Sequence, residues 1–181
     1  MDAKTHQTAV VVIPPPECWA PIQAIRQRHD RQFRRWMPHI TLVYPFRPRE
    51  QFASMAEELR RACAGIEAFE VHLAQFRHFG HGRGRYTVWL APEPPEGLVR
   101  LQTALLSVVP DCDDTAQHAP GFTAHLSIGQ VQGPEAVAKL RPKLQADWQP
   151  LSFAVREISL IWRNPPPDDV FRVDRVIRLG H

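Results

Sequence analysis

Short β-rich runs alternate along the chain with stretches of helical spacing, and prolines and glycines separate them. Runs of β-branched residues, or alternating polar and apolar positions, predict strands at residues 9–13, 39–44, 70–76, 86–90, 122–131, 153–162 and 170–179. Apolar positions three and four residues apart predict helices at residues 19–36, 50–63, 96–109 and 134–144. The order strand, helix, strand, helix, strand therefore occurs twice before the last strand.

This repeated order predicts a single domain, residues 1–181, built from two copies of one α/β unit. The copies cover residues of about 8–79 and 85–163, and the strand at 170–179 follows them. Two such units related by a pseudo-twofold axis give a bilobal α+β fold, in which antiparallel sheets face a central cleft and the helices lie outside. We therefore expect residues at equivalent positions of the two copies to meet in that cleft.

The composition is that of a folded domain, because 44% of the residues are apolar and no apolar run is long enough to span a membrane. The net charge of +3 is compatible with an anionic substrate, and the amino terminus lacks the pattern of a secretion signal. Cys18, Cys63 and Cys112 are too scattered for a disulfide framework, and His78 and His81 lack a third nearby zinc ligand. We therefore expect a cytoplasmic monomer without a membrane segment, metal or other cofactor.

One short motif occurs in both copies. His39-Ile40-Thr41 and His125-Leu126-Ser127 each combine a histidine, an apolar residue and a hydroxyl, and the two histidines lie 86 residues apart. Side chains in a strand alternate between two faces, so each strand presents an imidazole and a hydroxyl on the same side. If the lobes face each other, these four groups converge on one tetrahedral anion.

Such a set of groups suits phosphodiester chemistry by general acid–base catalysis. One neutral imidazole takes a proton from the attacking oxygen, while the other, protonated, gives a proton to the leaving oxygen. Thr41 and Ser127 are placed to stabilise the charge that develops on the non-bridging oxygens. A single His-x-Thr motif is more often structural, but two copies at matching positions favour a function. The pattern leaves open which of His39 and His125 is the acid.

The paired motifs resemble the signature of the two-histidine (2H) phosphoesterases, which include the 2′-5′ RNA ligase-like proteins, over nearly the whole chain. This resemblance implies hydrolysis, without metal, of 2′,3′-cyclic or 2′,5′-linked phosphodiesters in an RNA 3′ end, a cyclic nucleotide or a 2′-5′ oligonucleotide. Two alternatives stay open: reversible 2′-5′ RNA ligation, and a module that binds nucleotides or RNA ends without turnover. Gln130 stands where some relatives have a basic residue.

Substrate-binding residues are predicted at two further places. Phe79, Arg83 and Arg85 belong to a glycine-rich basic segment that suits a flap over a nucleotide. Trp162 and Arg163 are at the corresponding place of the second copy, where a ring would stack on a base and a cation would reach a phosphate. For the aromatic residues, burial in the core is the alternative.

Overall fold

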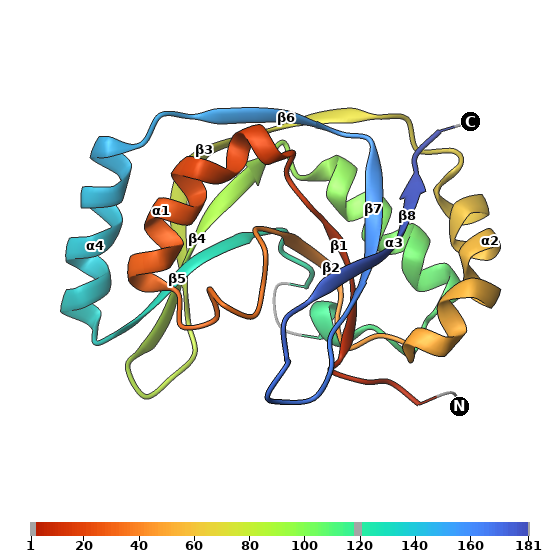
Figure 1. Cartoon of the computed structure of the whole chain (residues 1–181). Coiled ribbons are helices and arrows are strands. Elements are labelled where there is room, and N and C mark those ends of the chain that lie inside the picture. The colour runs from red at the N-terminus through yellow and green to blue at the C-terminus, as the bar shows by residue number, and fades with distance from the viewer. Residues whose placement is uncertain (1–2, 118–120, 181) are drawn as a thin grey trace.

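The structure is a computed structural model that describes residues 3–117 and 121–180, and its strands form two four-stranded sheets (Figure 1). The strands are β1 (Thr8–Val12), β2 (Ile40–Val43), β3 (Phe69–Gly80), β4 (Arg85–Glu93), β5 (Leu126–Gln132), β6 (Leu151–Val155), β7 (Glu157–Trp162) and β8 (Arg172–Arg178). The α-helices are α1 (Trp19–His29), α2 (Phe52–Cys63), α3 (Glu96–Val108) and α4 (Pro134–Asp147). Short 3-10 helices are η1 (Pro16–Cys18), η2 (Arg49–Gln51) and η3 (Asp114–Ala116).

Both sheets are antiparallel, with the orders β2-β1-β7-β8 and β5-β4-β3-β6. The predicted α+β fold with antiparallel sheets is therefore confirmed. Each sheet combines strands from both predicted copies, because β3 joins β4 and β7 joins β1. The division of one domain into two repeats stays a prediction. The strands that carry the two motifs, β2 and β5, are both edge strands, and they contact each other.

The helices divide between the two sheets. Helices α1 and α4 lie together at one end of the molecule and pack on the β5-β4-β3-β6 sheet, whereas α2 and α3 pack on the other sheet (Figure 1). Gly129 lets α1 approach β5 closely, since a Cβ atom there would lie 2.6 Å from the Cβ of His29. Within residues 3–117 and 121–180, no helix combines the length and apolar character needed to cross a bilayer.

The central strand β1 is buried on both faces. Val10 and Val12 point into the main hydrophobic core, whereas Ala9 and Val11 pack on the opposite face in a smaller cluster with Phe171. This double burial explains the uninterrupted apolar run in the sequence. Each fully buried Val stabilises the fold by roughly 1.5–3 kcal/mol. The smaller cluster lies on the face of the sheet that carries the first motif.

The helix predicted for residues 19–36 ends at His29, so its last part was wrong. Asp30 takes an extended conformation, and its carboxylate accepts hydrogen bonds from the side chain of Arg26 and the backbone N–H of Gln32, each at 2.8 Å. Short polar side chains of this kind compete with helical hydrogen bonds. The chain then turns, and residues 31–39 lead outside the helix to the first motif.

Two predicted strands also differ from the structure. The run at 153–162 forms two strands, because the chain leaves β6 at Arg156 and enters the other sheet as β7. The run at 122–131 becomes a strand only from Leu126. In the first run the apolar residues stay buried while the sheet changes, as Val155 and Ile158 show. In the second run Ala124 is already buried before strand pairing begins at Leu126.

Candidate active site

His39 and His125 each come directly before the first residue of an edge strand, β2 and β5, rather than within the strand as predicted. Each ring has its Nδ1 at 2.8 Å from the carbonyl oxygen two residues earlier, that of Met37 and that of Thr123. A carbonyl oxygen only accepts hydrogen bonds, so Nδ1 carries a proton in both rings. The Nε2 atom of each neutral imidazole is thereby left to accept a proton.

The strand after each histidine shows the predicted alternation. Thr41 and Ser127 are half-buried like the histidines, whereas the residues that separate them, Ile40 and Leu126, are fully buried. Because β2 and β5 contact each other, the two motifs lie on neighbouring edges of the two sheets. The structure therefore brings the two predicted pairs to one part of the molecule.

The electrostatic surroundings keep both imidazoles neutral. The pKa of His39 is lowered from the ordinary value of 6.5 to about 4, chiefly by burial and to a smaller extent by the nearby charges of Arg26 and His125. The Met37 carbonyl and Asp30 act in the opposite direction. Burial also lowers the pKa of His125. Since a charge on His125 acts on His39, the two rings are electrostatically coupled.

Aromatic rings hold His39 in place. Its ring stacks on Trp36 with centroids 4.5 Å apart, and Trp36 stacks in turn on Phe171 at 3.7 Å. Neither residue is predicted from the sequence, because the apolar spacing includes Trp36 in a helix and Phe171 is far away along the chain. The contact between them depends on the chain turning after α1.

His125 has an equivalent aromatic support. The ring of Phe79 lies 5.0 Å from the imidazole in an edge-to-face arrangement, and Trp89 stacks on Phe79 at 4.7 Å. Phe79 was predicted as a substrate-binding residue, and the structure places it against His125. Trp89 was missed, since an aromatic residue in a buried strand has no local signal that separates support of a site from ordinary core packing.

A β-bulge follows the hydroxyl residue in each motif strand. Leu42 is the extra residue in β2, since Val43 and Thr41 pair with consecutive residues of β1. Ile128 is the extra residue in β5, where Gly129 and Ser127 pair with consecutive residues of β4. A bulge shifts the alternation by one position, so the residue three after each hydroxyl returns to the face of that hydroxyl. These residues are Tyr44 and Gln130.

A buried ion pair anchors the segment that leads to His39. Arg26 is only 2% exposed, pairs with Asp30 at 2.8 Å, and donates a hydrogen bond of 2.9 Å to the carbonyl oxygen of Trp36. A further hydrogen bond reaches Gln23 at 2.9 Å. Arg26 thus fixes the position of Trp36, on which His39 stacks.

Gln130 connects this anchored segment to β5. Its side-chain oxygen accepts a hydrogen bond of 3.0 Å from the backbone N–H of Arg31, and its side-chain nitrogen donates one of 3.1 Å to Asp30. A lysine or arginine has no acceptor and would leave the Arg31 N–H without this bond. The amide, in place of a basic residue, therefore fits the local structure.

The remaining predicted binding residues lie on both sides of the histidines. Arg85 lines a cavity of ≈ 480 Å³ together with His81 and Gln130, whereas Arg83 is exposed at the tip of the hairpin between β3 and β4. The predicted flap is a hairpin turn, in which the N–H of His81 donates to the Arg85 carbonyl at 2.8 Å and the N–H of Arg85 donates to the Gly82 carbonyl at 3.1 Å. Gly82, Arg83 and Gly84 have positive φ.

Trp162 and Arg163 line a different cavity, of ≈ 320 Å³. The guanidinium of Arg49 covers the ring of Trp162 at 3.6 Å, which occupies one face that would stack on a base. Burial raises the pKa of the Tyr44 hydroxyl, and the charge and hydrogen bonding of Arg163 partly offset this rise. Arg163 therefore lies close to Tyr44. Of these two residues, Arg163 is therefore connected to the His39 side of the site.

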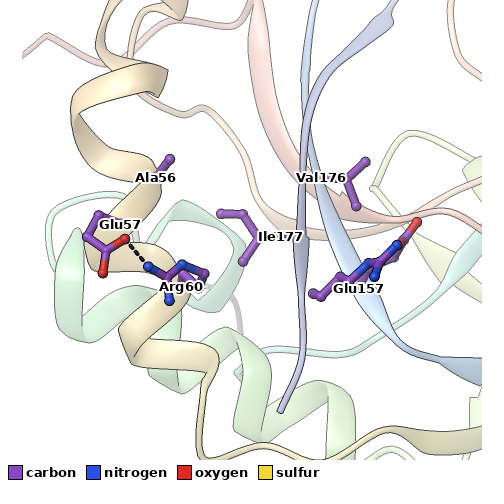
Figure 2. A pocket seen from close by; sticks show the side chains of 7 residues that line it. Ala56, Glu57, Arg60, Glu157, Val176 and Ile177 are labelled. Carbon is purple, nitrogen blue, oxygen red and sulfur yellow. Dashed lines mark hydrogen bonds and ion pairs between the residues drawn. The ribbon is translucent and has the colours of Figure 1, made fainter. Parts of the chain in front are cut away.

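A further cavity, of ≈ 590 Å³, lies between α2 and β8, away from the paired motifs (Figure 2). Glu57 and Arg60 of α2 pair with each other along its wall, and Ile177 of β8 points towards them, whereas Val176 projects from the other side of β8. None of the predicted site residues lines this cavity. Its charges already compensate each other, so it offers no site for the predicted anion.

Comparisons with known proteins show that the chain is a member of the 2H phosphoesterases. The model of the 2′-5′ RNA ligase superfamily matches residues 14–166, and the chain belongs to that family. A Geobacillus kaustophilus protein named "putative phosphoesterase" is 33% identical over 99 residues, which cover 54% of this chain and 56% of that protein. The chain thus spans about half the length of the curated relatives it matches.

Solved structures share the fold over almost the full length. TT0787 of Thermus thermophilus superposes with a TM-score of 0.64 at 20% identity, covering 97% of this chain and 99% of that one. Escherichia coli LigT, solved in complex with phosphate, gives a TM-score of 0.61 at 18% identity, covering 99% of this chain and 100% of LigT. LigT has also been solved with 3′-AMP. At these identities the likeness concerns the fold.

Proposed function

We propose that the protein is a phosphodiesterase that hydrolyses 2′,3′-cyclic or 2′,5′-linked phosphodiesters of RNA ends or small nucleotides without a metal. The observation that carries the proposal is the matched pair of imidazoles, each with Nδ1 bound to a backbone carbonyl and Nε2 left for proton transfer, on the contacting edges of the two sheets. The complexes of LigT with phosphate and with 3′-AMP support a substrate of this class. We also propose that the protein acts as a cytoplasmic monomer.

In this proposal, one of His39 and His125 removes the proton of the attacking water or hydroxyl, and the other protonates the leaving oxygen. The same Nδ1 arrangement equips both rings for either role. Thr41 and Ser127 donate hydrogen bonds to the non-bridging oxygens as charge develops on them. A bound phosphodiester carries a negative charge, which raises the pKa of the nearby imidazoles and opposes the effect of burial.

The test is hydrolysis of a 2′,3′-cyclic nucleotide in the presence of EDTA. His39→Ala and His125→Ala should each lower kcat by about 10²–10⁴-fold, the usual contribution of a general acid or base. His72→Ala is the matched control, since His72 is exposed on β3 and bonds Ser152 instead. Activity that persists in both site variants, or that requires added metal, would contradict the proposal.

The pH profile gives an independent check. Because the pKa values of both histidines lie below 6.5 in the free protein, the bell-shaped profile of kcat/KM should have its maximum on the acid side of neutrality. Tight binding of the nucleotide without turnover would instead favour the binding module, and joining of 2′-5′ RNA ends would favour the ligase.

A further inference from the structure

The cavity beside His125 has a strongly cationic wall. The hairpin between β3 and β4, strand β5 and the segment after α1 enclose ≈ 480 Å³, with Arg31, Arg85 and His81 among the lining residues. Among the residues that the structure describes, no aspartate or glutamate belongs to this lining. Uncompensated cations around a concave surface attract an anionic group.

The two arginines of this lining have no carboxylate partner among the described residues. In the part of the chain that the structure describes, the exposed guanidinium groups of Arg31 and Arg85 form no ion pair. The neighbouring Arg34 and Arg35 behave differently, since both pair with Asp169. Arg31 and Arg85 are therefore available for a ligand, and a guanidinium binds a phosphate through two parallel hydrogen bonds.

The cavity is continuous with the face that carries the second motif. Trp89 pairs with Ser127 across the sheet, and Thr87, two residues earlier in β4, pairs with Gln130 in the cavity wall. His81 bonds Thr87 at 2.8 Å, and its charge contributes to the lowered pKa of His125, so the cavity and the imidazole are close. Thr87 and Trp89 are two residues apart in β4, so the position of Gln130 in the cavity wall and that of Ser127 are separated by about 7 Å.

That separation is comparable to the span between the two phosphates that flank one ribose in a nucleic acid chain. We propose that the cavity formed by Arg31, Arg85 and His81 binds a second phosphate of the substrate, the one on the 5′ side of the ribose whose 2′ or 3′ phosphate lies between His39 and His125. This inference rests on the proposed function. The second phosphate is either a terminal 5′-phosphate or the phosphodiester to the preceding nucleotide.

The test compares ligands that the protein does not hydrolyse, by calorimetry. Adenosine 3′,5′-bisphosphate should bind more tightly than adenosine 3′-monophosphate. The double variant Arg31→Gln, Arg85→Gln should lose at least about tenfold of the affinity for the bisphosphate only, because both guanidinium groups that bind the second phosphate are removed. Arg28→Gln is the matched control: Arg28 is exposed near the end of α1 and lines a different cavity. This variant should keep the preference for the bisphosphate.

A dinucleotide with a 3′-phosphate forms a second arm of the experiment. If the double variant loses affinity for the dinucleotide more than for the bisphosphate, the phosphodiester is the natural occupant, and the reverse identifies the 5′-phosphate. Equal affinity of the wild type for bisphosphate and monophosphate, or an unchanged preference in the double variant, would overturn the inference. Turnover of a cyclic nucleotide is measured separately, so failure of the proposed function leaves a different pattern: no hydrolysis, with the phosphate preference intact.

Discussion

Acidification should destabilise the protein through His39. The pKa of this residue is about 4 in the folded protein against 6.5 for an ordinary histidine, so the unfolded chain takes up the proton first as the pH falls. The contribution of His39 to the free energy of unfolding is therefore complete above pH 6.5, decreases from there towards pH 4, and stays constant below that. Between about pH 7 and about pH 4 the loss amounts to about 3 kcal/mol.

The measurement is urea unfolding at these two pH values, followed by tryptophan fluorescence. Carboxylates that are ion-paired in the folded protein, such as Asp169, also lose stabilisation in acid, so wild type must be compared with a variant that lacks only the imidazole. His39→Gln should lose about 3 kcal/mol less than wild type on going to the lower pH. His72→Gln, at an exposed position, should lose as much as wild type.

An equal loss in wild type and His39→Gln would refute the reasoning, because it would mean that the folded protein does not hold this imidazole neutral. A direct titration of the His39 ring by NMR provides the second readout. A midpoint near 6.5 there would contradict the role of burial even if the unfolding data were ambiguous.

Two further changes test the supports of the site. Asp30→Asn leaves the charge of Arg26 buried without its partner and should lower the free energy of unfolding by about 3–5 kcal/mol in urea, whereas a loss under about 1 kcal/mol would contradict the buried pair. Gly129→Ala should destabilise by about 1–3 kcal/mol, because the new Cβ would lie 2.6 Å from the Cβ of His29 and 2.9 Å from its carbonyl oxygen. Gly65→Ala is its control, with nothing within 4 Å, and should be neutral; equal thermal midpoints for both glycine variants would disprove the close packing of α1 on β5.

The sequence predicted the fold to the extent that the fold depends on local pattern. Alternation and proline boundaries identified the strands and the repeat of element order, and the α+β class followed. The split at Arg156 was not predictable, since both β6 and β7 are apolar and only tertiary pairing places them in different sheets. The end of α1 was missed because Asp30 ends the helix through its contact with a buried arginine.

The candidate site shows the same limit. The doubled motif predicted His39 and His125 as the catalytic pair, and that role stays a prediction. Period-two alternation predicted that each histidine shares a face with its hydroxyl, and the structure has all four at half-buried positions next to buried residues. Trp36 and Trp89 were missed, because their role depends on rings brought together from distant segments. Single-residue bulges leave no mark in an apolar pattern, so the shared face of Tyr44, Gln130 and the hydroxyls was not predictable from the sequence.

These bulges also make the two sides of a symmetric motif different. On the His39 side, the bulge presents Tyr44, a bulky ring beside Arg163 that packs on Trp36 at 5.5 Å. On the His125 side, it presents Gln130, whose amide bonds Asp30 and Arg31 in the segment after α1 and lines the cavity that contains Arg85. The imidazoles and hydroxyls alone would accept a phosphodiester in either direction, whereas the flanking residues distinguish its two ends. We therefore expect the flanks to fix the orientation of the substrate, and with it which histidine acts as the acid.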